Sequence, residues 1–292
     1  MGFCKTLYLR NLFLRIDAHQ HFWKYDAEIH SWMEGPWAVL RHDFLPADFQ
    51  PVLQESEFDG SIAVHASQTA SETHWLLEQA EQHSFILGVT GWIDLLGDVS
   101  AQLTALPNSG KLRALRHFLQ FEEEAFFQNE TFRENLRLLG EKGLPFELLI
   151  TPDQLQTATE LVQACPETTF VLDHLAKPDI AGGEFACWQT GFGKLAACTN
   201  VHAKVSGLVT QVNWESWKPA DLIPYLDAAF DVFGPERLMA GSDWPVCSCT
   251  SSHAEVMNIL KNYMKNYSEK DQAAVFGCNC ARIYGIEEYE SV

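Results

Sequence analysis

Positive charge is scarce in this sequence: 20 lysine and arginine residues stand against 39 aspartate and glutamate residues, which gives a formal net charge of −19 at pH 7. Nucleic acids and anionic membrane surfaces are recognised through basic patches, so neither is expected as a partner. The chain also lacks an apolar run of transmembrane length and any low-complexity tract. These absences favour a soluble globular protein that acts on a small molecule.

Motifs for several common chemistries are missing as well. No glycine-rich phosphate loop, dinucleotide-binding fingerprint or nucleophile elbow is found, which argues against nucleotide chemistry and covalent serine catalysis. The cysteine pairs Cys247/Cys249 and Cys278/Cys280 are separated by a single residue, whereas structural zinc sites commonly use a longer gap. We therefore expect free thiols, and eight scattered cysteines in a long chain suit a reducing cytoplasm.

What the chain does contain is an alternation of apolar, β-branched runs with segments of helical spacing. The runs predict eight strands, at 16–22, 60–67, 86–94, 112–119, 145–150, 169–174, 201–208 and 237–243. Eight strand–helix units without a dividing linker predict an α/β fold of the (β/α)₈ TIM-barrel type over 16–292. A doubly wound open sheet uses similar units but usually fewer. Residues 1–15, without a small-residue cleavage pattern, are expected to form an N-terminal extension, and 268–283 a final added helix.

Polar residues gather at the ends of five of these runs, where a barrel of this type carries its chemistry. They are His19 and His21, Arg116 and His117, Asp173 and His174, Lys204 and Ser206, and Ser242 and Asp243. Each has an alternative explanation: a histidine or aspartate at a strand end is often a cap or a hydrogen-bonded core group, and Lys204 suits a buried ion pair. Their coincidence on one rim predicts a site.

The histidines of the first strand are spaced for joint action. Because alternate residues of a strand share a face, His19 and His21 should project together and can chelate a metal or hold one oxygen of a substrate. The alternative is a pair of polar residues on a solvated strand. Asp17 has the same parity and is expected one layer deeper, as a partner of His19. Arg116 and His117, being adjacent, should point to opposite faces.

The connection after the first strand is unusually long and rich in tryptophan. Residues 23–45 contain Trp23, Trp32 and Trp37, and are too many for a bare barrel loop. The segment is interpreted as a lid or substrate wall that excludes water, and local packing over the barrel mouth is the alternative.

Five motifs together resemble one known family. They are Asp17-Ala-His-Gln-His-Phe-Trp23, Arg116-His117, Leu172-Asp-His-Leu-Ala-Lys-Pro178, Lys204-Val-Ser-Gly207 and Gly241-Ser-Asp-Trp-Pro245. The combination resembles the amidohydrolase superfamily, specifically its branch of sugar-lactone hydrolases typified by L-fuconolactonase and L-rhamnonolactonase. The match runs from about Ile16 to Ile286. The resemblance implies a (β/α)₈ barrel that hydrolyses an aldono-1,4- or 1,5-lactone to the free sugar acid.

The resemblance also implies roles for individual residues. His19, His21, His174 and Asp243 match the metal-site positions, for one divalent ion expected to be Zn²⁺, with metal-independent activity as the alternative. Asp243 would activate a water, and His174 and His117 would assist catalysis. Substrate contacts are assigned to Trp23, Trp32, Arg116 and Lys204.

Two departures from the family stand out, and other functions stay open. Strand five, Phe146-Glu147-Leu148-Leu149-Ile150, lacks the bridging lysine of two-metal members, and His65 replaces a more usual glutamine. Related barrels decarboxylate or hydrate unsaturated carboxylic acids, and a non-catalytic sugar-acid-binding protein is a further alternative. The sequence leaves the ring size, the sugar and the oligomeric state open, and it is compatible with a homo-oligomer.

Overall fold

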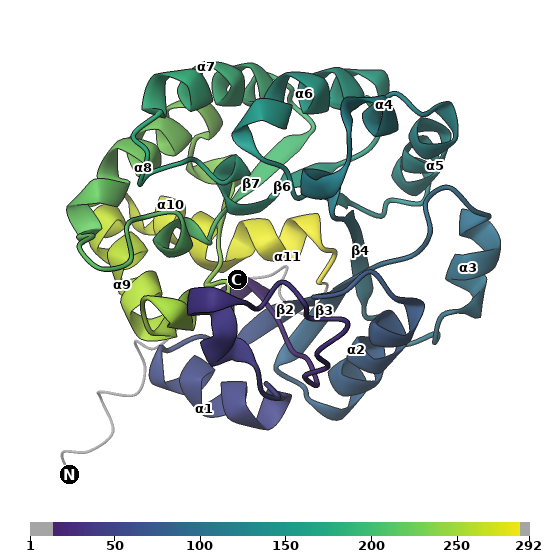
Figure 1. Ribbon diagram of the computed structural model, residues 1–292, viewed down its shortest axis with the longest axis horizontal. Coiled ribbons are helices and arrows are strands. Elements are labelled where there is room, and N and C mark those ends of the chain that lie inside the picture. The colour runs from purple at the N-terminus through teal and green to yellow at the C-terminus, as the bar shows by residue number, and fades with distance from the viewer. Residues whose placement is uncertain (1–13, 287–292) are drawn as a thin grey trace, which may run out of the picture.

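The computed structural model describes residues 14–286, and these form a ring of parallel strands surrounded by helices. The strands are hydrogen-bonded in chain order from β1 to β8, and the helices follow each other around the outside in the same order (Figure 1). The predicted TIM barrel is therefore confirmed. Of the predicted N-terminal extension, only its last two residues, Leu14 and Arg15, lie within the described part of the chain.

The elements of the described residues have the following bounds. The strands are β1 (Ile16–Gln20), β2 (Gly60–Val64), β3 (Ile86–Gly91), β4 (Leu112–His117), β5 (Phe146–Leu148), β6 (Phe170–Leu172), β7 (Val201–Val205) and β8 (Leu238–Ala240). The α-helices are α1 (Pro46–Glu55), α2 (Ala70–Gln82), α3 (Val99–Ala105), α4 (Glu124–Phe127), α5 (Glu130–Glu141), α6 (Leu155–Ala164), α7 (Phe185–Ala196), α8 (Pro219–Phe233), α9 (His253–Tyr263), α10 (Glu269–Ala273) and α11 (Asn279–Ile283). The short 3₁₀ helices are η1 (Gly35–Leu40), η2 (Leu119–Phe121), η3 (Pro152–Gln154), η4 (Asp173–Ala176), η5 (Leu208–Thr210), η6 (Pro235–Arg237), η7 (Val246–Cys249) and η8 (Met264–Asn266), and η9 (Ala274–Cys278) is a π-helix.

The predicted strands all exist, and each ends earlier than its apolar run. In strand eight, for example, the run to Asp243 contains a strand that ends at Ala240. The ladder stops there because the residues that follow turn away to present side chains at the barrel mouth. The final helix is also confirmed, as the continuous segment from α10 through η9 to α11. The helix caps follow ordinary rules: Ser252 and Glu255 form the capping box of α9, and Asn129 caps α5.

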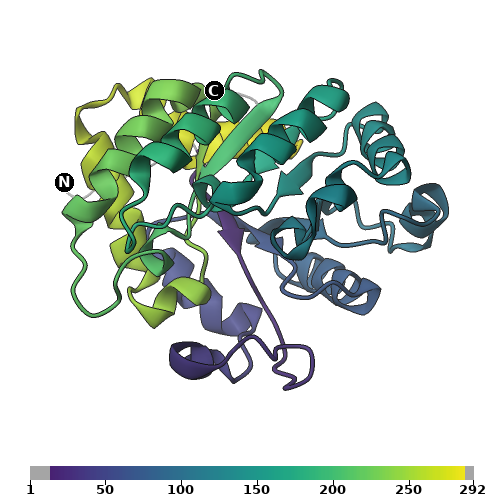
Figure 2. The same cartoon turned by 45° about the horizontal axis from the view of Figure 1, so that its top comes forward.

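The barrel interior is filled from its lower end by the C-terminal helix. Cys280 and Tyr284 belong to the same buried apolar cluster as the inward-facing residues of the strands, such as Ile16, Val64 and Met239. A second, larger cluster fills the layer between the strands and the outer helices. Figure 2 shows α11 toward one end of the barrel and the long connection between β1 and α1 projecting beyond the other. Only the end with the long connection is left for a site.

The ring closes between β1 and β8 through a buried carboxylate. The backbone N–H of Asp243 donates to His19 O at 2.8 Å, and that of His21 donates to Trp244 O at 2.7 Å. Beneath this seam, Asp17 accepts hydrogen bonds from the Ser242 hydroxyl at 2.6 Å, the Ser242 backbone N–H at 2.9 Å and the His19 backbone N–H at 3.1 Å.

The position of Asp17 corrects the expectation from parity. The register of β1 shifts between Asp17 and Gln20, so simple alternation does not hold through the strand. Asp17 contacts the backbone of His19, not its imidazole, and meets His253 Nε2 of α9 at 3.1 Å. It is a structural clasp between the seam and the helix layer.

Two expectations about the chain as a whole can be compared with the structure. All seven cysteines in the described part of the chain are free thiols, as predicted. Within residues 14–286, no helix combines the length and apolar character needed to cross a membrane.

The Asp17 clasp generates a stability prediction. Replacing Asp17 with alanine leaves Ser242 and His253 without their buried acceptor, and each buried polar group left unpaired costs about 1–3 kcal/mol. We expect Asp17→Ala to lower the free energy of unfolding, measured by urea denaturation, by at least about 3 kcal/mol. The matched control is Asp98→Ala, which removes the exposed cap of α3 and should cost only about 1 kcal/mol. Equal losses in the two variants would contradict the role assigned to Asp17.

Candidate active site

A cavity of about 380 Å³ opens at the carboxyl ends of the strands. Its aromatic walls are formed by Trp23, Trp32, Trp37, Phe118 and Phe121. Its polar groups include His21, Arg116, Gln120, His174, Lys177 and Asp243. All three tryptophans come from the long connection after β1, as the substrate-wall interpretation predicted. Such a volume suits a small molecule bound between apolar faces with a few polar contacts.

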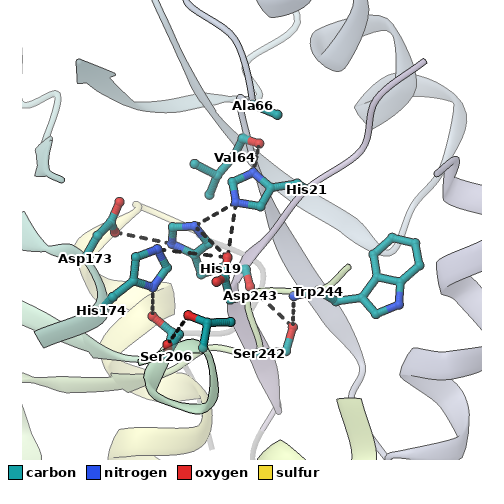
Figure 3. A network of polar contacts seen from close by, with 12 residues as sticks. His19, His21, Val64, Ala66, Asp173, His174, Ser206, Ser242, Asp243 and Trp244 are labelled. Atoms are coloured by element: carbon teal, nitrogen blue, oxygen red, sulfur yellow. Dashed lines mark hydrogen bonds and ion pairs between the residues drawn. The ribbon is translucent and has the colours of Figure 1, made fainter. Parts of the chain in front are cut away.

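Four side chains converge at the floor of this cavity (Figure 3). His21 Nε2 lies 3.2 Å from His19 Nε2 and 3.3 Å from Asp243 Oδ1. The same carboxylate oxygen is 3.8 Å from His19 Nε2 and 4.0 Å from His174 Nε2. The paired projection of His19 and His21 is therefore as predicted, and two distant strand ends complete the group.

The donor set of this cluster fits a divalent ion. Atoms of His19, His174 and Asp243 lie within 4.8 Å of one another, and His21 Nε2 lies beside two of these residues, His19 and Asp243. Around a tetrahedral ion with bonds of about 2.0–2.1 Å, ligand atoms lie about 3.3–3.4 Å apart, close to the separations seen here. The Nδ1 of His21 donates to Val64 O at 2.7 Å, which leaves the Nε2 lone pair of the neutral ring free for a cation.

The backbone presents two members of the cluster in a costly conformation. Four successive residues, His174 to Lys177, have positive φ angles between 48° and 60°, and Asp243 has φ of 62°. Left-handed backbone costs roughly 1–2 kcal/mol for each residue that carries a Cβ. Tertiary contacts hold the turn: Trp188 Nε1 donates to Leu175 O at 2.8 Å, and the hydroxyl of Ser206 lies 2.9 Å from His174 Nδ1. Such strain is typical of functional sites.

A glycine on the neighbouring strand end makes room for His174. Gly207 has φ of 65°, and a Cβ placed on it would lie 2.5 Å from His174 Nδ1. A side chain at this position would therefore collide with the imidazole, and the conformation itself favours glycine. Gly207, which belongs to the same motif as Lys204, thus leaves room for His174 at the end of another strand.

Below the cluster lies a layer of paired charges. Lys204 Nζ lies 2.7 Å from Glu147 Oε2 and 3.1 Å from Asp173 Oδ1, and Arg116 Nη1 lies 2.9 Å from Asp173 Oδ2. Lys204 Nζ is also 3.2 Å from His19 Nδ1. The group His19, Glu147 and Asp173 has the spacing of a second metal site, but the ammonium of Lys204 already lies among these three residues. The site therefore has room for one metal ion.

The surroundings shift the pKa values of the cluster toward forms that can bind a cation. Burial lowers the pKa of His174 to about 4, and burial also holds the pKa of His19 well below 6.5. For Asp243, burial alone would raise the pKa, but His174, His21 and Lys177 bring it below its ordinary value of 3.8. At neutral pH His19 and His174 are thus uncharged, and Asp243 is a carboxylate.

The predicted site residues fall into two groups. Trp23, Trp32 and Arg116 line the cavity, together with His21, His174 and Asp243, and His19 lies just beneath. His117 does not face it: its ring stacks on Phe126 and its Nε2 lies 2.8 Å from Glu122 Oε1. Of the two adjacent residues, Arg116 lines the cavity and His117 does not.

Lys204 is the second correction. It is fully buried among carboxylates under the cavity floor and does not line the cavity, so it is the buried ion pair that was the alternative to substrate binding. In turn, Lys177 and Gln120 line the cavity but were not among the predicted site residues. Lys177 lies within one of the five motifs, so its place three residues after His174 was the available signal.

Comparison with known proteins agrees with this geometry. The sequence model of the family described as Amidohydrolase matches residues 16–286. The L-fucono-1,5-lactonase of Burkholderia multivorans is 35% identical over 287 residues, which cover 94% of this chain and 97% of that protein. The L-fucono-1,5-lactonase of Burkholderia ambifaria is 33% identical, with coverage of 94% and 96%.

A solved structure is similar over nearly the whole chain. The crystal structure of an amidohydrolase from Burkholderia multivorans with bound zinc superposes with a TM-score of 0.90 at 36% identity, covering 93% of this chain and 99% of that chain. The matching segment contains every strand of the barrel and all four residues of the cluster. The chain therefore belongs to the amidohydrolase family.

Proposed function

We propose that this chain hydrolyses a sugar-derived lactone, an aldono-1,4- or 1,5-lactone such as L-fuconolactone or L-rhamnonolactone, to the free sugar acid. The observation that carries the proposal is the Asp243 carboxylate, placed among three imidazoles at the floor of an aromatic-walled cavity. The two lactonase relatives, which align over nearly the full length of the chain, support the same reaction.

Asp243 is the base of the proposed reaction. Its lowered pKa keeps it ionised at neutral pH, so it can take a proton from a water at the cavity floor. The water oxygen forms a bond to the lactone carbonyl carbon, and the bond from that carbon to the ring oxygen breaks. Asp243 then returns the proton to the ring oxygen, which becomes the hydroxyl of the open-chain acid. No outside oxidant or reductant is needed.

His19, His21, His174 and Asp243 would hold one divalent ion, which we infer to be zinc. When bound, such an ion supplies a Lewis acid for the carbonyl oxygen and lowers the pKa of water. The chain supports this arrangement by fixing the His21 ring through Val64 O and the His174 ring against Ser206. Metal-independent hydrolysis would instead require the imidazoles to donate hydrogen bonds to the substrate. The Nδ1 proton of His21 is not available for this, because it is donated to Val64 O.

The remaining cavity residues orient the substrate and exclude water. Trp23 and Trp32 offer flat faces for the C–H surfaces of a sugar ring. Arg116 reaches the cavity while its Nη1 is held by Asp173, so the guanidinium is fixed in direction. His117 has no part in the reaction because it lies outside the cavity.

The first prediction from the proposed function concerns the proposed base, Asp243. Asp243→Asn should lower kcat for L-fucono-1,5-lactone by about 10²–10⁴-fold, the usual contribution of a positioned base. Activity is measured by pH-stat, in which each lactone opened consumes one equivalent of base and releases no CO₂. His117→Asn is the matched control and should keep turnover of the wild-type order.

Each alternative function has its own result in this assay. Release of CO₂ from an unsaturated carboxylic acid in place of lactone opening would favour a decarboxylase. Binding of a sugar acid with no turnover in the wild type would indicate a binding protein. Loss of activity in His117→Asn equal to that in Asp243→Asn would contradict the site as assigned.

The second prediction concerns metal content. The purified protein should carry close to one zinc per chain by inductively coupled plasma mass spectrometry, because Lys204 fills the neighbouring group. His174→Ala removes one ligand and should lower the retained zinc at least about tenfold after dialysis. Two zinc ions per chain, or full retention in His174→Ala, would contradict the proposed ligand set.

The third prediction is the pH dependence of that metal content. A ligand must be deprotonated to bind zinc, and a lowered pKa postpones protonation to more acid solution. Because burial lowers the pKa of His174 to about 4, and that of His19 also falls well below 6.5, zinc should stay bound from pH 7 to about 5. It should be released only as the pH approaches about 4, as followed by dialysis and elemental analysis. Release beginning near pH 6.5 would show that these histidines titrate as exposed ones do.

A further inference from the structure

Lys177 is a partly buried lysine that faces the cavity without a carboxylate partner. Its Nζ donates to Gln120 Oε1 at 2.5 Å, which is the one polar contact of the ammonium within residues 14–286. Burial lowers the pKa of the Lys177 ammonium, with Asp243 acting in the opposite direction. An ammonium has three donors, so two of them point to no group of the described protein.

The other two cations near the cavity are already neutralised. Arg116 is paired with Asp173 at 2.9 Å, and Lys204 is paired with Glu147 at 2.7 Å and with Asp173 at 3.1 Å. These two cations and two carboxylates balance one another beneath the cavity floor. Among the described residues that line the cavity or lie directly beneath it, Lys177 is thus the cationic side chain without a carboxylate partner.

The backbone conformation places Lys177 at the cavity. It is the last residue of the left-handed turn that begins at His174, and its N–H donates to His174 O at 2.9 Å. Leu175 and Ala176, between them, are fully buried in the apolar core, so the two polar ends of the turn face the cavity. Gln120 is held in turn by a bond from its N–H to Leu149 O at 2.8 Å. The backbones from which Lys177 and Gln120 reach the cavity are thus both hydrogen-bonded.

The proposed reaction creates the charge that such a cation would bind. A lactone is neutral, and opening its ring with water yields a carboxylic acid that loses its proton at neutral pH. Asp243 is again a carboxylate at that point, so the cavity would hold a second carboxylate beside it. A fixed ammonium offsets that repulsion, and it acts on negative charge that is absent from the substrate and present in the transition state and product.

We propose that Lys177, positioned by Gln120, binds the carboxylate of the sugar acid and the negative charge that develops on the lactone carbonyl as the ring opens. The inference rests on the proposed lactonase function and adds a specificity for anionic product over neutral sugar. Lys177 is then a catalytic residue in its own right, separate from the histidine cluster.

The test compares an anion with a neutral molecule of the same shape. Binding of L-fuconate and of the neutral alditol L-fucitol is measured by calorimetry to the wild type, Lys177→Met, Lys177→Arg and Lys194→Met. Lys177→Met should weaken L-fuconate binding roughly 10- to 100-fold, the usual effect of losing a charge-assisted contact, with no change for L-fucitol. Lys177→Arg should recover part of the loss. Lys194, on the outer surface of α7, is the matched control and should behave as the wild type.

Kinetics give an independent readout. Because the lactone is neutral, Lys177→Met should lower kcat for L-fucono-1,5-lactone at least about tenfold while KM changes little. Three results would overturn the role of Lys177. The wild type could fail to bind L-fuconate, Lys177→Met could bind it as tightly as the wild type does, or Lys177→Met could lose affinity for L-fuconate and L-fucitol in parallel. If the wild type opens no lactone, the proposed function fails, and the binding comparison still decides whether Lys177 is the carboxylate site.

Discussion

The structure depends on the convergence of three imidazole nitrogens and one carboxylate oxygen at the seam where the barrel closes. His19 Nε2, His21 Nε2 and Asp243 Oδ1 lie within 3.8 Å of one another, close enough to share one cation. The hydrogen bonds between β1 and the residues after β8, with Asp17 beneath them, hold these side chains in place. The hydrogen bonds that close the barrel between β1 and β8 therefore also position His19, His21 and Asp243.

The charges of the barrel are organised in layers along its axis. Apolar side chains and Tyr284 fill the lower end, and the hydroxyl of Tyr284 donates to Glu147 at 2.6 Å. The balanced layer of Lys204, Arg116 and two carboxylates lies above them and carries no net charge to the cavity. The reactive layer follows, with Asp243 and Lys177 as its two opposite charges. Because the charges of the lower layer are buried and paired, the field in the cavity is set by a few groups near the substrate.

Backbone strain is concentrated where His174, Lys177 and Asp243 are presented to the cavity. Five residues with a Cβ adopt left-handed angles at the ends of β6 and β8, and the buried contacts of Leu175, Ala176 and Trp188 offset that cost. A regular strand could not present His174 and Lys177 to one cavity at this spacing, because it would place them on opposite faces. The left-handed turn brings both to the mouth, with two apolar residues between them packed into the core.

The sequence by itself determined the barrel and most of the rim, because the periodicity of apolar residues and the polar ends of five of the eight runs are local properties. It placed His19, His21, His174 and Asp243 in one site, since the carboxyl ends of parallel strands meet. Which of Arg116 and His117 faces the cavity was decided only by the tertiary structure, because parity separates neighbours but does not say which side is the interior. The same holds for Lys204, whose partners Glu147 and Asp173 come from β5 and from the turn after β6. It holds also for Lys177, whose lack of a carboxylate partner is visible only once Arg116 and Lys204 are seen to be paired.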